Sequence, residues 1–111
     1  ILSITKIIKM KTKEEIKRLL IKHKHLQDSD PKLISTYWFN EVKEKGLNMY
    51  EMTAYDFLKL FADSKLTNTE TISRMRRQVQ EEHEDLRGKY YQIRQGTKQK
   101  EWKQRLGYEV N

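Results

Sequence analysis

Apolar side chains recur every three or four residues along most of the chain, which is the spacing of a helix with one buried face. The widest apolar stripe consists of Leu33, Ile34, Tyr37, Trp38 and Val42. We expect its helix to begin at Asp30, to carry Pro31 in its first turn and to end at Gly46. This helix is predicted to form the centre of the core, with the aromatic residues 37–39 as part of it.

Two further helices are predicted on either side of it. Thr12 and Glu15 have the spacing of a capping box, and the helix that they begin is expected to run to about His25. A short helix is expected to begin at Thr53, with Asp56 in its first turn, and to stop near residues 63–64. Its apolar positions are Phe57, Leu58, Leu60 and Phe61.

A fourth helix is predicted within residues 66–88, where three arginines fall within four residues. Thr67 and Glu70 form a second capping-box candidate, with Asn68 or Thr69 as alternative caps, and Gly88 is a plausible stop. On a helical wheel Ile72, Met75 and Val79 fall within about 60° of one another. Arg74, Arg77, Gln78 and Glu81 lie roughly opposite, and Arg76 falls near the edge of the buried stripe.

Composition supports an all-α fold, a small bundle of four to five helices. The 111 residues include four glycines, one proline and no cysteine, which excludes a disulfide framework and thiolate metal sites. Residues 1–9 are interpreted as a non-native or flexible extension, with Met10 as the natural start. Residues 10–88 are predicted to form the helical domain, and residues 89–111 a basic arm or helix. No apolar run is long enough for a membrane span, and we expect a cytoplasmic protein.

The net charge of +7 is unevenly distributed. Residues 1–25 carry +6, residues 26–64 carry −3 and residues 65–111 carry +4. Basic ends around a mildly acidic middle are compatible with a polyanionic partner, although they do not require one.

The stretch "ADSKLTNTETISRM" resembles the helix-turn-helix of bacterial and phage repressors, over residues 58–77. In that pattern Ala62 allows two helices to pack closely, and Ile72 enters the core between them. The "TISR" at Thr71–Arg74 resembles the start of recognition helices in regulators of the lactose-repressor type. The family favours glycine in the turn, where this chain has Leu66, so we expect a longer turn. A helix-turn-helix is thus predicted at residues 53–83.

If that geometry holds, the fourth helix would read double-stranded DNA. Arginine can bond two acceptors of a guanine edge, and glutamine can do the same on adenine, so Arg74, Arg77 and Gln78 are expected to face bases. Contacts to the DNA backbone are expected from Lys65, Thr69, Thr71, Ser73 and Arg76. A small basic domain of this kind would reach successive major grooves as a homodimer.

A wider resemblance concerns "TETISRMRRQVQEEHEDLRG", which looks like a segment of small phage and prophage proteins of Gram-positive bacteria. It covers residues 66–88 well and residues 11–108 loosely. Those proteins are of uncharacterised function, so the resemblance implies a phage origin and no activity. Glu84 and Asp85 stand before "LRG" where proline is common in that group.

Other functions remain open. A phage-encoded module that binds a host or phage protein would use the mixed face of Arg74, Arg77 and Glu81. A ring-forming packaging subunit would use a tail helix around Trp102 and Leu106. No phosphate loop or nucleophile with a matched base is present, so neither an enzyme nor a cofactor is expected. No metal site is expected either, because His23 and His25 would lie about 200° apart on a helix. Tyr90 and Tyr91 are expected to anchor the tail, or to stack on bases.

Overall fold

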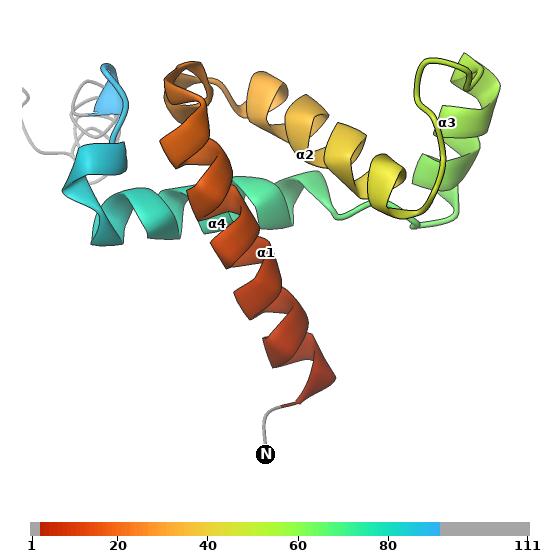
Figure 1. Ribbon diagram of the computed structural model, residues 1–111. Coiled ribbons are helices and arrows are strands. Elements are labelled where there is room, and N and C mark those ends of the chain that lie inside the picture. Colours follow the sequence, from red (N-terminus) through yellow and green to blue (C-terminus); the bar gives the residue numbers. More distant parts are fainter. Residues whose placement is uncertain (1–2, 92–111) are drawn as a thin grey trace, which may run out of the picture.

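The computed structural model describes residues 3–91, and in this range all regular secondary structure is helical, without strands (Figure 1). The elements are α1 (Ile4–Lys22), η1 (Lys24–Asp28), α2 (Asp30–Glu44), α3 (Ala54–Ala62), α4 (Thr69–Glu82) and η2 (Glu84–Leu86), where η marks a short 3₁₀ helix. The all-α prediction is confirmed. The predicted tail helix around residues 102–106 lies outside the described residues.

The first helix begins earlier than the Thr12–Glu15 capping box predicted. Ser3 is the N-cap, and its hydroxyl accepts a hydrogen bond from the backbone N–H of Lys6 at 3.2 Å. Thr12 is buried inside the helix, where its hydroxyl donates to the carbonyl of Ile8 at 2.9 Å. A threonine can satisfy its hydroxyl within a helix in this way, so the capping spacing alone did not define the start. Residues 4–9 therefore form the first turns of α1.

The helices α1 and α4, which cross at the core, end in the same manner. His23 and His83 adopt nearly the same extended backbone, with φ/ψ of −128°/92° and −126°/98°. Each histidine N–H donates to a helix carbonyl four residues back at 2.8 Å, and each histidine carbonyl accepts from a leucine N–H three residues on at 3.0 Å. The leucines, Leu26 and Leu86, are both buried. The pattern His-x-x-Leu thus ends a helix and returns an apolar side chain to the core.

This ending corrects two expectations. The first helix stops at Lys22 rather than near His25, so the rings of His23 and His25 do not point apart and instead lie 5.7 Å from centroid to centroid. The fourth helix stops at Glu82 rather than at Gly88. Gly88 serves another purpose, because a β-carbon there would lie 2.2 Å from an Asp28 carboxylate oxygen. The Asp28 carboxylate accepts hydrogen bonds from the backbone N–H groups of Lys89 and Tyr90 at 2.9 and 3.1 Å.

The core lies where α1 crosses α4, and α2 closes its side (Figure 1). Its buried members come from α1, η1, α2, α4 and η2: Ile16, Leu19, Leu20, Leu26, Leu33, Ile72, Met75, Val79 and Leu86. The predicted stripe of α4 is therefore the face that packs. Tyr37 and Trp38 are half-buried against this cluster, while Phe39 packs on Tyr50. The predicted aromatic residues therefore lie at the margin of the core, and α2 lines its side instead of forming its centre.

The ends of α2 and α3 follow local signals. Ser29, and not Asp30, caps α2 by accepting the N–H of Lys32 at 3.3 Å, which leaves the Asp30 carboxylate available for another contact. Gly46 follows α2 with a φ of +78°, a left-handed conformation that glycine adopts without strain. Thr53, the expected start of the third helix, is the N-cap of α3 and forms a capping box with Asp56.

Candidate functional site

The entry of α4 is held by α2. Asn68 caps α4 by accepting the N–H of Glu70 at 2.7 Å. One residue earlier, the carbonyl of Thr67 accepts the Trp38 indole N–H at 2.7 Å. The Glu41 carboxylate accepts both the N–H of Thr67, at 2.7 Å, and its hydroxyl. These contacts fix the direction in which α4 leaves the connection.

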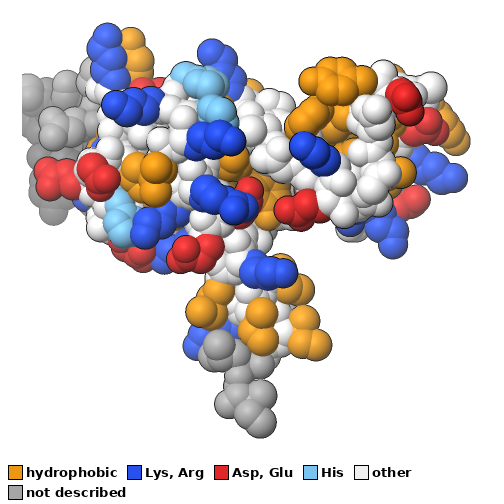
Figure 2. Space-filling view, viewed as in Figure 1, with side chains coloured by type: hydrophobic (Ala, Val, Ile, Leu, Met, Phe, Trp, Pro, Cys, Tyr) orange, Lys and Arg blue, Asp and Glu red, His pale blue; other side chains and the backbone are white. Residues whose placement is uncertain are grey.

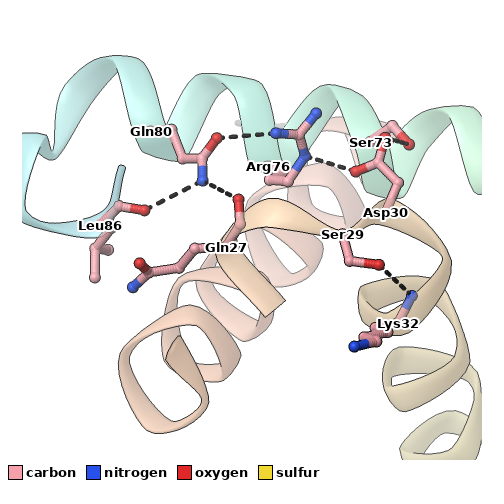
Figure 3. A network of polar contacts seen from close by, with 8 residues as sticks. All are labelled: Gln27, Ser29, Asp30, Lys32, Ser73, Arg76, Gln80 and Leu86. Atoms are coloured by element: carbon pink, nitrogen blue, oxygen red, sulfur yellow. Dashed lines mark hydrogen bonds and ion pairs between the residues drawn. The ribbon is translucent and has the colours of Figure 1, made fainter. Parts of the chain in front are cut away.

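A polar bracket then fastens the first half of α4 to the start of α2 (Figure 3). The Arg76 Nε lies 2.6 Å from an Asp30 carboxylate oxygen, and the Ser73 hydroxyl donates to the other oxygen at 3.1 Å. The Arg76 side chain is only 11% exposed, whereas that of Asp30 is 36% exposed. Arg76 thus points along the body of the protein.

The second half of α4 is fastened by Gln80, which is fully buried. Its side-chain oxygen accepts from Arg76 at 2.9 Å, and its amide nitrogen donates to the carbonyls of Gln27 and Leu86 at 2.9 and 3.2 Å (Figure 3). Arg87 donates to the carbonyls of Gln80 and Glu81 at 2.6 and 2.9 Å, so a cation covers the C-terminal end of the helix. The position of α4 is therefore determined along its whole length.

The outward face of α4, defined here as Glu70, Arg74, Arg77 and Glu81, is exposed. Its only close ion pair between described residues joins Arg74 to Glu70 at 3.3 Å, one helical turn apart. Gln78 lies half-buried on the flank of this face. The face carries two positive and two negative charges, with the arginines between the glutamates.

The eight residues predicted to contact DNA separate into two groups in the structure. Arg74 and Arg77 are exposed on the outward face, while Thr69 and Lys65 are exposed at and before its leading end. Thr71 and Gln78 are half-buried beside them. Ser73 and Arg76 belong to the Asp30 bracket, whose acidic partner comes from a segment more than 40 residues away and gave no signal in the local sequence.

In the predicted helix-turn-helix at residues 53–83, α3 would support α4. In the structure α2 supports it instead. Ala62 is exposed, and α3 contributes no buried residue to the core around Ile72. Instead α3 packs on α2, where the rings of Phe57 and Phe61 lie 5.8 and 5.9 Å from that of Trp38. Ser64 has a φ of +56° in the connection, and Leu66 is buried, so the connection is longer than a tight turn.

One ion pair ties α1 to the end of α4. Lys13 Nζ lies 2.6 Å from a carboxylate oxygen of Glu82. The hydrogen bond from Lys13 lowers the pKa of Glu82, with smaller contributions in the same direction from the charges of Lys13, His83 and Lys17. The later turns of α4 thus face a basic part of α1.

The remaining ring contacts lie after η2. The Arg87 guanidinium carbon is 4.9 Å from the centre of the Tyr91 ring, and Lys89 Nζ is 5.8 Å from that of Tyr90. Both distances suit a cation–π contact. Tyr90 is exposed and Tyr91 half-buried, and both cations lie within four residues of the rings, so these contacts are local. The tail that the two tyrosines were expected to anchor lies outside the described residues.

Within residues 3–91, no group of histidine, cysteine, aspartate or glutamate side chains is arranged to hold a metal ion. None of the described helices is long and apolar enough to cross a bilayer. Comparisons of the chain with protein-family models, with curated proteins and with solved structures gave no significant match.

Proposed function

We propose that the protein binds double-stranded DNA through the outward face of α4 and performs no chemistry of its own. One observation carries the proposal. The inner face of α4 is anchored to α1 and α2 by the core and the Asp30 bracket, while Arg74 and Arg77 are exposed on the opposite face. A helix held in this way can present two guanidinium groups to a groove with little loss of freedom on binding.

In this proposal α2, rather than the preceding helix α3, supports α4, so the recognition helix is held by a helix that is not its neighbour in the chain. It holds the entry of α4 through Trp38 and Glu41. The N-terminal turn of α4 then leads into the groove, with the exposed Thr69 hydroxyl and Lys65 beside the phosphates. Ser73 and Arg76 act as positioning residues, since both are bound to Asp30.

The glutamates of the outward face set a limit on affinity. The Arg74–Glu70 pair is exposed, and such pairs contribute about 0–1 kcal/mol. A bidentate contact of arginine to a base provides about 1–3 kcal/mol of discrimination, so Arg74 can leave Glu70 for DNA at a net gain. Glu81 lies beyond Arg77 toward the C-terminal end, where a recognition helix leaves the groove.

The balanced charge of this face also favours a second candidate, a module that binds another protein. Alternating Glu70, Arg74, Arg77 and Glu81 would suit a partner with the opposite alternation of charge. Its affinity would depend less steeply on salt than that of a DNA complex, because no counterion layer is released.

The test is the affinity of the full chain for random duplex DNA at about 50 and about 200 mM salt, measured by fluorescence anisotropy. The variant is Arg74→Ala/Arg77→Ala. Its matched control is Arg18→Ala/Lys22→Ala, which removes the same charge from exposed positions on α1. The variant removes two positive charges from the DNA interface, which is expected to reduce the slope of log K against log salt by at most about 1.8.

The proposal requires that the α4 variant bind DNA more weakly and with a smaller dependence on salt. The α1 control should retain most of the affinity and most of the salt dependence. A wild-type chain that does not bind at the lower salt would overturn it, as would equal losses in the two variants. If DNA binding fails while the α4 variant still folds, the second candidate takes its place.

A further inference from the structure

The N-terminal half of α1 projects from the body of the protein (Figure 1). Side chains of α1 become buried only from Thr12 onward, and those described between residues 3 and 11 are all exposed. They include Ile4, Ile7, Ile8 and Met10, with exposed fractions between 46% and 78%. Figure 2 shows these hydrophobic side chains gathered on the projecting part. Isoleucines on an isolated helix surface indicate an unfilled contact.

This apolar face does not point the same way as the rest of the helix. At 100° per residue, Ile4, Ile7 and Ile8 are centred about 90° from the stripe of Thr12, Ile16 and Leu19 that faces the core. Ile4 and Ile7 therefore do not continue the core stripe, whereas Ile8 lies at its edge. Their partner has to approach from another side.

That side opens into a groove of about 900 Å³ between α1 and α2. One wall comes from α1, where the apolar Ile7, Ile8 and Met10 are followed by two cations and two carboxylates: Lys11, Glu14, Glu15 and Arg18. The other comes from α2, with Tyr37 above two carboxylates, Glu41 and Glu44. With the carboxylates of this second wall included, the groove has a net negative charge. An occupant that fits both walls is a helix with an apolar face on one side and positive charge on the other.

The same half of α1 has this composition. Ile4, Ile7 and Ile8 form one face, while Lys6 and Lys9 lie on the opposite face, and the first acidic residue of the helix is Glu14. We propose that the groove binds the N-terminal half of α1 from a second copy of the chain. Two copies related by a twofold axis place each projecting half in the groove of the other.

In this dimer the two helices run antiparallel, with isoleucine against isoleucine. The lysines of each helix then face the acidic wall formed by the partner's α2. Because Glu41 already binds Thr67, the exposed Glu44 is the carboxylate most available to them. The dimer is independent of DNA, so its test does not depend on the proposed function.

The experiment is sedimentation velocity of the full chain, without DNA, from low micromolar to several hundred micromolar concentration. Ile8→Asp places a charge in the apolar contact and is expected to raise the dimer Kd at least about tenfold. Ile21→Asp is the matched control, because Ile21 is also an exposed isoleucine of α1 but lies outside the groove. Both positions are exposed, so circular dichroism should show folded protein for each.

A charge exchange tests the occupant itself. Glu44→Lys alone and Lys6→Glu/Lys9→Glu alone should each weaken the dimer, and their combination should restore it toward the wild-type Kd. A chain that stays monomeric over the whole range would overturn the proposal. Equal effects of the two isoleucine variants on the dimer Kd would also overturn it. So would a combined charge variant whose dimer is weaker than that of either charge variant alone.

Discussion

The Asp30 bracket allows an asymmetric prediction about stability. Asp30→Asn keeps the shape of the side chain but removes the anion beside Arg76. The Arg76 side chain is 11% exposed, so its guanidinium would lose its charge partner where little water can replace it. Breaking a fully buried pair costs about 3–5 kcal/mol, and an exposed pair about 0–1 kcal/mol. Because Arg76 is largely buried and Asp30 is partly exposed, we expect Asp30→Asn to lower the free energy of unfolding by about 2 kcal/mol.

The reverse change should cost less. Arg76→Met keeps the apolar stem and leaves Asp30, which is 36% exposed and sits in the first turn of α2. Water and the positive end of that helix can both stabilise the remaining carboxylate. We expect about 1 kcal/mol, part of which reflects the lost bond to Gln80.

The double variant decides the argument. Once Arg76 is methionine, the loss of the Asp30 charge leaves no buried cation, so Asp30→Asn/Arg76→Met should be no less stable than Asp30→Asn alone. Urea unfolding followed by circular dichroism gives all three free energies. Strictly additive effects, or a larger loss for Arg76→Met than for Asp30→Asn, would refute the view that Arg76 depends on Asp30 for its burial.

Three further expectations follow from single contacts. Gly88→Ala brings a β-carbon against Asp28, and the displaced carboxylate loses two N–H partners. We expect the free energy of unfolding in urea to fall by about 1–3 kcal/mol. In an Asp28→Ala background the same change should cost much less. Trp38→Phe keeps an aromatic ring beside Phe57 and Phe61 but removes the hydrogen bond to the Thr67 carbonyl, and thermal unfolding should show a loss of about 1 kcal/mol. The pKa of Glu82 is lower in the folded protein than in the unfolded chain, where a glutamate has a pKa of about 4.3. Its contribution to stability is therefore fully present above that unfolded value and is lost as the pH falls through the lower folded pKa. In an NMR titration Lys13→Gln should raise the pKa of Glu82, and an unchanged pKa would exclude the hydrogen bond as its cause.

Local signals in the sequence predicted part of the local structure. The start of α3 at Thr53 and the left-handed Gly46 were predicted. The capping boxes predicted for the first and fourth helices are not formed, because Ser3 caps α1 and Asn68, which was the alternative cap, caps α4. The stripe of Ile72, Met75 and Val79 also packs as its spacing required. Each of these features is decided within one or two helical turns.

Features that depend on distant partners were missed. Arg76 lies on the flank of the buried stripe, and its direction is decided by Asp30, which the sequence assigned to capping instead. The same holds for Gly88, which was read as a helix stop and in fact allows a close approach to Asp28. The choice of α2 as the neighbour of α4 also rests on contacts between distant segments, at Trp38 and Glu41.

The route of the chain between α2 and α4 has a consequence for how this protein can change. The buried cluster draws on residues 16–33 and 72–86, while the chain leaves the body after Val42 and returns at Leu66. The two ends of this segment are joined by the hydrogen bond from the Thr67 N–H to the Glu41 carboxylate. The entropy of closing a loop grows only slowly with its length. The stretch that contains α3 can therefore lengthen or shorten with little cost to stability beyond the cover that it gives Trp38.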